Sequence, residues 1–166
     1  MTKRLQRAAF VTTLFGILAV AAPAISAGDE KALVGSYRLT KRVGKDGHEL
    51  TGPTVIGIMT FSRTHRTVIL KWNGPDDEPV SISFIATYTL SGGKYCESVV
   101  YGEQSNLGAP GVSYDTPSTS PTCTAASSDA SGLAFDVPNE KLRLRVTRAG
   151  ILATTPRWTD HWDKVK

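Results

Sequence analysis

The sequence of 166 residues predicts an all-β protein, in which a single antiparallel sheet of about eight strands closes into an up-and-down barrel. The clearest signal is the segment 80–90, where apolar and small polar residues alternate with the period of two that is typical of a strand with one buried face. Gly92-Gly93 follows and supplies the positive φ angles of a tight hairpin turn. No segment after residue 27 has a strong helical periodicity in its sequence, so we expect the other elements to be strands.

Residues 1–27 have the layout of a secretory signal peptide. A basic start precedes an apolar run over 8–22, and the small residue Ala27 offers a cleavage position before the mature chain. The apolar run is shorter than the roughly 20 residues that span a bilayer, which favours a cleaved signal over a membrane anchor. We therefore predict export to the periplasm or the exterior, and one mature domain over 28–166 without a transmembrane segment.

The charge balance argues against a nucleic-acid partner. The leader contains three of the 19 basic residues and none of the 15 acidic residues, which leaves 16 basic residues against 15 acidic ones. Binding of a phosphate backbone needs a concentrated positive surface, and this balance does not provide one. The sequence also lacks the Cys-x-x-Cys and His-x-x-x-His spacings of metal sites, so we expect no metal and no cofactor.

Cys96 and Cys123 are the two cysteines of the chain, and an even number in an exported protein favours a disulfide. Such a bond would tie the return strand of the central hairpin to the segment beyond it, and would stabilise the fold by roughly 3 kcal/mol. The alternative is a pair of separate buried thiols.

The expected strands follow one another through polar turns, for example at 45–48, 62–65 and 73–79. The segment 102–131 differs, because it is rich in Ser, Thr, Gly, Pro and Ala and has few large apolar residues to bury. We predict that it forms one long irregular loop, either a functional lid or a mobile segment. The expected strands are 33–40, 55–61, 67–72, 80–90, 95–101, 133–137, 142–147, 151–154 and 157–165.

The short connections favour a barrel over a Greek-key sandwich, and closure also removes exposed edge strands. Gly35-Ser36-Tyr37-Arg38-Leu39 is similar to the Gly-x-Trp opening of lipocalin-like domains. Further short motifs follow in the order expected of small bacterial members, so that most of 33–165 resembles this family. In that family the opening aromatic closes one end of the barrel and a basic residue from the last strand lies over it. The resemblance implies that Gly35 and Tyr37 close the barrel, with Arg157 or Lys164 as the basic partner.

The resemblance also implies a cup that binds a small hydrophobic or amphipathic molecule. Independently, a barrel of about eight strands is wide enough either to hold one small ligand or to be filled by side chains. Both alternatives stay open at this point, because inward aromatic residues often form a solid core. The residues expected to line a cavity are Ile82, Phe84, Tyr88, Leu142 and Leu144.

Two other functions compete with this carrier hypothesis. An enzyme of the isomerase or cyclase type would need an acid or base inside the cup, and Glu97 is the candidate because it shares a strand face with Tyr95, Val99 and Tyr101. An outward, solvated Glu97 is the more common arrangement for a carboxylate. A periplasmic interaction module that uses the segment 102–131 is the third hypothesis. We expect surface positions for the histidines, His48, His65 and His161.

Overall fold

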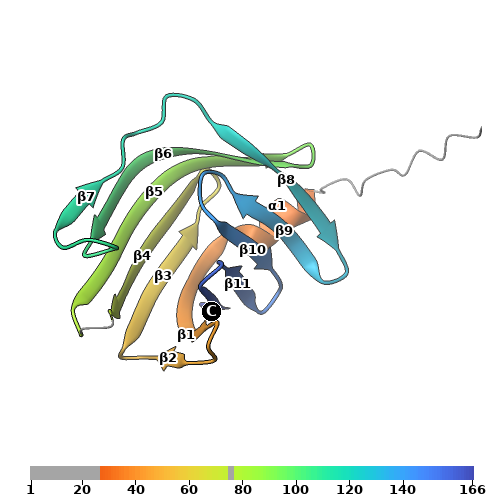
Figure 1. Ribbon diagram of the computed structural model, residues 1–166. Coiled ribbons are helices and arrows are strands. Elements are labelled where there is room, and N and C mark those ends of the chain that lie inside the picture. Colours follow the sequence, from red (N-terminus) through yellow and green to blue (C-terminus); the bar gives the residue numbers. More distant parts are fainter. Residues whose placement is uncertain (1–26, 75–76) are drawn as a thin grey trace, which may run out of the picture.

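Twelve strands and one short helix form the described part of the chain, which covers residues 27–74 and 77–166 of a computed structural model (Figure 1). Apart from Ala27, the predicted signal peptide over 1–27 lies outside the described residues. The elements in chain order are α1 (Ala27–Leu33), β1 (Gly35–Gly44), β2 (Glu49–Thr51), β3 (Val55–Phe61), β4 (His65–Asn73), β5 (Pro79–Ser91), β6 (Lys94–Ser105), β7 (Val112–Tyr114), β8 (Thr122–Asp129), β9 (Gly132–Val137), β10 (Leu142–Val146), β11 (Gly150–Thr154) and β12 (Trp158–Lys164).

Ten of these strands form a closed antiparallel barrel, because β12 returns to pair with β1. The order around the barrel is β1, β3, β4, β5, β6, β8, β9, β10, β11 and β12. The other two strands lie outside this ring, where β2 pairs with β1 and β7 pairs with β6. The prediction of an all-β barrel is confirmed, whereas the expected number of about eight strands is too low.

β8 is the barrel strand that the sequence analysis missed. It lies in the segment 102–131, which we expected to form one long irregular loop, and it pairs with β6 on one side and β9 on the other. Strand pairing uses main-chain N–H and C=O groups, so small Ser, Thr and Ala side chains are sufficient for it. The parts at 106–111 and 115–121 are irregular, as predicted.

The hairpin of β5 and β6 contains a β-bulge, which changes the face of several residues. Ile85 pairs with Tyr101 but Ala86 pairs with Val99, so Val100 is an extra residue in β6. Glu97 and Val99 face the barrel interior, and beyond the bulge the inward position passes to Gly102 while Tyr101 is exposed. The expectation that Tyr101 shares a face with Glu97 is therefore wrong.

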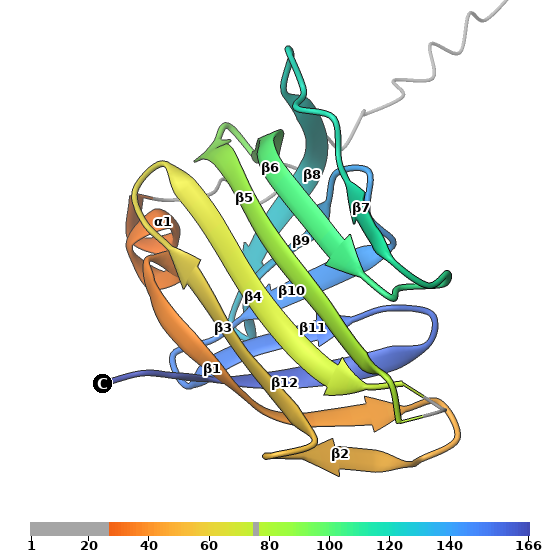
Figure 2. The same ribbon diagram turned by 90° about the vertical axis from the view of Figure 1, so that its left-hand side faces the viewer.

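One end of the barrel is closed by α1, which lies where β1 begins (Figure 2). We expected the first strand to begin at Leu33, but this residue ends the helix and is fully buried. The Tyr37 hydroxyl donates hydrogen bonds to the carbonyl oxygens of Leu33, at 2.8 Å, and Ala32, at 3.1 Å. These bonds satisfy carbonyls at the helix end that have no intrahelical partner.

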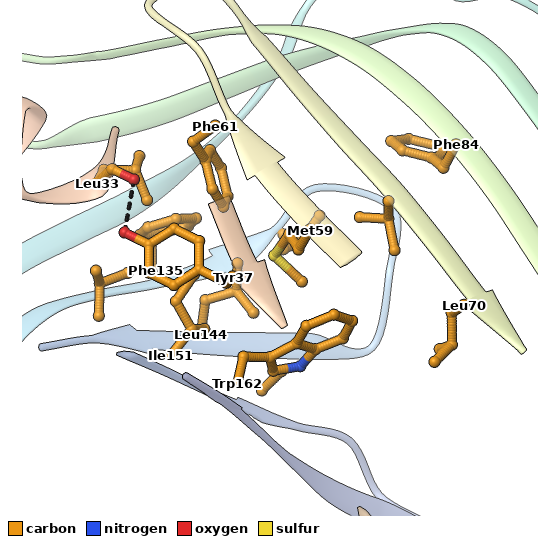
Figure 3. Close-up of a cluster of buried hydrophobic side chains, with 14 of the residues drawn as sticks. Leu33, Tyr37, Met59, Phe61, Leu70, Phe84, Phe135, Leu144, Ile151 and Trp162 are labelled. Carbon is orange, nitrogen blue, oxygen red and sulfur yellow. Dashed lines mark hydrogen bonds between the residues drawn. The ribbon is translucent and has the colours of Figure 1, made fainter. Parts of the chain in front are cut away.

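At this closed end, buried hydrophobic side chains gather around Tyr37 and Phe61 (Figure 3). Aromatic rings follow one another across the interior, with centroids 5.4 Å apart for Phe61 and Tyr88 and 4.2 Å apart for Tyr95 and Phe135. Tyr37 continues the series through an edge contact with Phe61. Such edge and stacked pairs contribute beyond the apolar area that they bury. We call this layer, which is formed around the rings of Tyr37, Phe61, Tyr88, Tyr95 and Phe135, the closed half of the barrel.

Candidate ligand-binding site

A cavity of about 790 Å³ occupies the other half of the barrel, which we call the open half. Its walls come from inward positions of β4 and β5, and from the connections β9–β10 and β11–β12. The volume lies in the range of roughly 300–1,000 Å³ that is typical of small-molecule sites. The apolar lining residues are Met59, Val68, Leu70, Ile82, Phe84, Val99, Leu107, Leu142, Ala153, Trp158 and Trp162.

The structure divides the predicted lining residues between the two halves. Ile82, Phe84 and Leu142 line the cavity. Tyr88 and Leu144 are instead buried in the closed half, where the Tyr88 hydroxyl donates to the Ser62 carbonyl at 2.6 Å. All of them belong to the inner face, but a strand of this length crosses both halves. Alternation predicts the face of a residue and not its height along the barrel.

One residue of the cavity wall, Arg66, belongs to a buried ion pair. Arg66 Nε and Nη2 donate to the two carboxylate oxygens of Glu97, at 2.9 and 2.8 Å, and their side chains are only 2% and 3% exposed. The Tyr95 hydroxyl also donates to Glu97. The common expectation of an outward, solvated Glu97 is therefore wrong for this residue. The carboxylate is tolerated inside because Arg66 neutralises it and hydrogen bonds replace its hydration.

Glu140 is a second carboxylate on the same arginine. Glu140 lies in the β9–β10 turn, and its Oε1 accepts a hydrogen bond from Arg66 Nη2 at 2.6 Å. Burial alone would lower the pKa of Arg66, but the charges of Glu140 and Glu97 raise it overall, so the guanidinium stays protonated. Burial raises the pKa of Tyr95 far above its usual value, so its hydroxyl stays a hydrogen-bond donor.

The pairing of Glu97 with Arg66 bears on whether Glu97 could act as a catalytic base. Both oxygens of Glu97 accept hydrogen bonds from Arg66, and one of them also accepts the Tyr95 hydroxyl. A general base must accept a proton from a substrate within hydrogen-bond reach. Glu97 would have to break this buried pair to do so, and the arrangement therefore suits a structural and electrostatic role.

A second buried ion pair, which the sequence analysis missed, also lines the cavity. Arg42 Nε and Nη2 donate to the Asp160 carboxylate at 2.7 and 2.8 Å. The guanidinium carbon lies 4.5 Å from the ring centroids of both Trp72 and Trp158, and these two rings also contact each other, with centroids 6.3 Å apart. Alternation from Leu39 would place Arg42 outside, but an irregularity between Leu39 and Lys41 shifts the register and turns Arg42 inward.

The residues expected to close the barrel lie at two different ends. Lys164 Nζ lies 5.4 Å from the ring centroid of Tyr37 and donates to the Ala32 carbonyl at 3.1 Å. Gly35 makes room for this lysine, since a Cβ there would lie 2.6 Å from Lys164 Cε. Arg157 lies instead beside the cavity in the β11–β12 connection and is exposed. Burial raises the pKa of Tyr37 to about 12.

The predicted disulfide is confirmed. Cys96 and Cys123 are bonded and occupy paired positions of β6 and β8, with Cα atoms 4.0 Å apart. The disulfide therefore links β8, whose side chains are mostly Ser, Thr and Ala, to β6 of the central hairpin. His48 and His65 are exposed, and His161 is half-buried. Among the described residues, no cluster of three or more His, Cys, Asp or Glu side chains could hold a metal ion.

No protein-family model, curated protein or solved structure matches this chain. The similarity to lipocalin-like domains therefore stays a prediction from short motifs. Within the part of the chain that the structure describes, no helix is both long enough and apolar enough to cross a membrane.

Proposed function

We propose that the protein is an exported, lipocalin-like carrier that binds a small hydrophobic or amphipathic molecule in the open half of its barrel. The observation that supports this most strongly is the cavity of about 790 Å³. The lining combines thirteen apolar residues, two of them prolines, with twelve polar or charged ones, so it offers both an apolar surface and polar groups that could orient a small molecule. The closed half supplies the rigid base on which such a site depends.

The charged residues of the open half also support a binding role. Arg42, Asp160, Arg66 and Glu97 are all buried, although apolar residues of similar volume would stabilise a simple core at least as well. The place of Arg42, Asp160 and Arg66 in the cavity wall is explained if these residues position a ligand. Because the carboxylates of Asp160 and Glu97 are both bound by arginines, we favour a carrier over an enzyme.

Export is proposed from the leader over 1–27, and the disulfide is compatible with it. Disulfides persist in oxidising compartments such as the periplasm and are rare in the cytosol. The cargo would therefore be a molecule met outside the cytoplasm.

The carrier function can be tested with the full chain, expressed with export in a bacterial host and titrated with the fluorescent apolar probe N-phenyl-naphthylamine. We expect saturable binding to one site. Ile82→Trp, which fills the cavity from β5, should abolish it. The matched control is Ile69→Trp on the neighbouring strand, where the side chain is 59% exposed on the outer face. Absence of saturable binding, or equal binding by both variants, would refute the carrier function.

A further inference from the structure

Two buried N–H donors at the cavity have no hydrogen-bond acceptor among the described residues. They are Nη1 of Arg42 and Nε1 of Trp162, in residues that are only 4% and 2% exposed. Both residues line the cavity. A buried donor without an acceptor lowers stability, so each one calls for an explanation. At a cavity wall the simplest explanation is a ligand that supplies the acceptor.

Neighbouring contacts hold both donors in place. Asp160 binds Nε and Nη2 of Arg42, which leaves Nη1 as the nitrogen without a partner, and the rings of Trp72 and Trp158 pack against the guanidinium. The Trp162 ring reaches β3, where a Cβ on Gly57 would lie 3.0 Å from its Cη2 atom. Asp160 and Trp72 thus hold the guanidinium, and β3 holds the Trp162 ring, before any ligand arrives, which lowers the entropic cost of binding.

The two donors belong to one part of the wall. Arg42 is the cross-strand partner of Asp160 in the pairing of β1 and β12. Asp160 and Trp162 are both buried and lie two positions apart on β12, so they are neighbours on its inner face. Arg42 and Trp162 are therefore neighbours on the inner face, the first opposite Asp160 and the second two positions from it on β12.

We propose that Arg42 and Trp162 form a head-group subsite for the neutral carbonyl oxygen of an amphipathic ligand, whose apolar part lies against Phe84, Leu70 and Ile82. This inference rests on the proposed carrier function. A carbonyl oxygen has two lone pairs and can accept from two donors. An ester, amide or ketone suits the site better than a carboxylate, because Asp160 already neutralises Arg42 and a second anion would be buried beside it.

Both nitrogens are covered by neighbouring atoms, so the carbonyl reaches them only after a small displacement of the wall. Trp158 is the suitable side chain to move. It is half-buried, it begins β12 beside the cavity, and its ring covers one face of the Arg42 guanidinium. Its displacement would leave the ion pair of Arg42 and Asp160 in place.

The test is displacement of N-phenyl-naphthylamine from the full chain by methyl decanoate, decanoic acid and decane. We expect the methyl ester to bind roughly tenfold more tightly than the ionised acid of the same chain length. Trp162→Phe keeps a ring but removes the donor, and should weaken binding of the ester roughly three- to tenfold without changing that of decane. Tyr37→Phe is the control, since it removes a buried hydroxyl from the closed half, and should change neither affinity.

The stability of Trp162→Phe provides a second readout. Nε1 has no acceptor to lose in the folded protein, so we expect the midpoint of urea unfolding of the ligand-free variant to fall only through the lost packing of the larger ring against β3, with no added loss from a broken hydrogen bond. Tighter binding of the acid than of the ester, or equal loss of ester and decane affinity in Trp162→Phe, would overturn the head-group subsite. A protein that binds neither the probe nor any of the competitors would instead refute the carrier function itself.

Discussion

The closed and open halves of the barrel are built from the same strands but differ in how their interiors are filled. In the closed half, aromatic rings and aliphatic side chains fill the interior from Tyr37 to Phe135. In the open half, the same inner faces carry the two buried ion pairs and line a cavity that opens to solvent. The first arrangement maximises dispersion and apolar burial, whereas the second gives up packing for a shaped, polar-edged space.

This difference indicates where stability and function reside. Burying an ion pair costs desolvation that its attraction rarely exceeds by much, so such pairs are weak sources of stability. Fully buried rings are strong sources of it. We therefore expect the closed half to hold the fold together and the open half to determine what is bound.

Truncation of one phenylalanine in each half should separate them most clearly. Phe135→Ala should lower the free energy of unfolding by about 3–5 kcal/mol, because Phe135 is fully buried and stacks on Tyr95. Phe84→Ala should cost clearly less, because one side of this ring already faces the cavity. Urea unfolding of both variants measures the difference. Equal losses would indicate that the two halves are equally packed.

Breaking one buried ion pair should lower the free energy of unfolding by a similar amount. The cause here is the loss of a charge partner and not the loss of packing. Glu97→Leu leaves the buried Arg66 with the partly exposed Glu140 as its remaining carboxylate partner and removes the acceptor of the Tyr95 hydroxyl, and should cost about 3 kcal/mol. The double variant Arg66→Leu with Glu97→Leu removes both charges and should recover most of that loss. If the double variant is no more stable than Glu97→Leu in urea unfolding, the ion pair itself stabilises the open half and our comparison is wrong.

High pH should act on the closed half. Burial raises the pKa of Tyr37 and of Tyr88 to about 12, above the ordinary value of 10.0. Their contribution to stability is therefore complete below the unfolded-state pKa and falls as pH rises from about 10 to about 12. We expect urea midpoints to fall over this interval, and the fall to be smaller in Tyr37→Phe. A pH-independent midpoint in the wild type would contradict this assignment.

The smallest effect concerns the contact across the closed end. Lys164→Met removes a cation that lies over Tyr37 and should cost about 0.5–1 kcal/mol. Arg157→Met, in the β11–β12 connection beside the cavity, should change the free energy of unfolding by less than this, since Arg157 is exposed. A larger loss of stability for Arg157→Met than for Lys164→Met would contradict this prediction, because the stabilising cation would then lie beside the cavity and not over Tyr37.

The parts of this fold that alternation determines were predictable from the sequence. The segment 80–90 becomes the inner face of β5, and Cys96 and Cys123 are joined as expected. β8 was not predictable from its composition, because main-chain pairing and the disulfide hold it in place.

The candidate site was only partly predictable. Ile82, Phe84 and Leu142 were expected in the cavity wall and lie there. The inward position of Arg42 could not be predicted, because it depends on the register shift in β1. The inward position of Glu97 depends on Arg66, a partner 31 residues away. Pairings between distant residues leave no local pattern in the sequence, and they decide which half of the barrel is hollow.

The most direct test of a half-hollow barrel is methyl NMR of the full chain, with and without N-phenyl-naphthylamine. We predict intermolecular contacts and shift changes at the methyl groups of Val68, Leu70, Ile82 and Leu142 in the open half. The methyl groups of Leu133, Leu144 and Val146 in the closed half should be unaffected. Probe contacts in the closed half, or none in the barrel interior, would contradict our account.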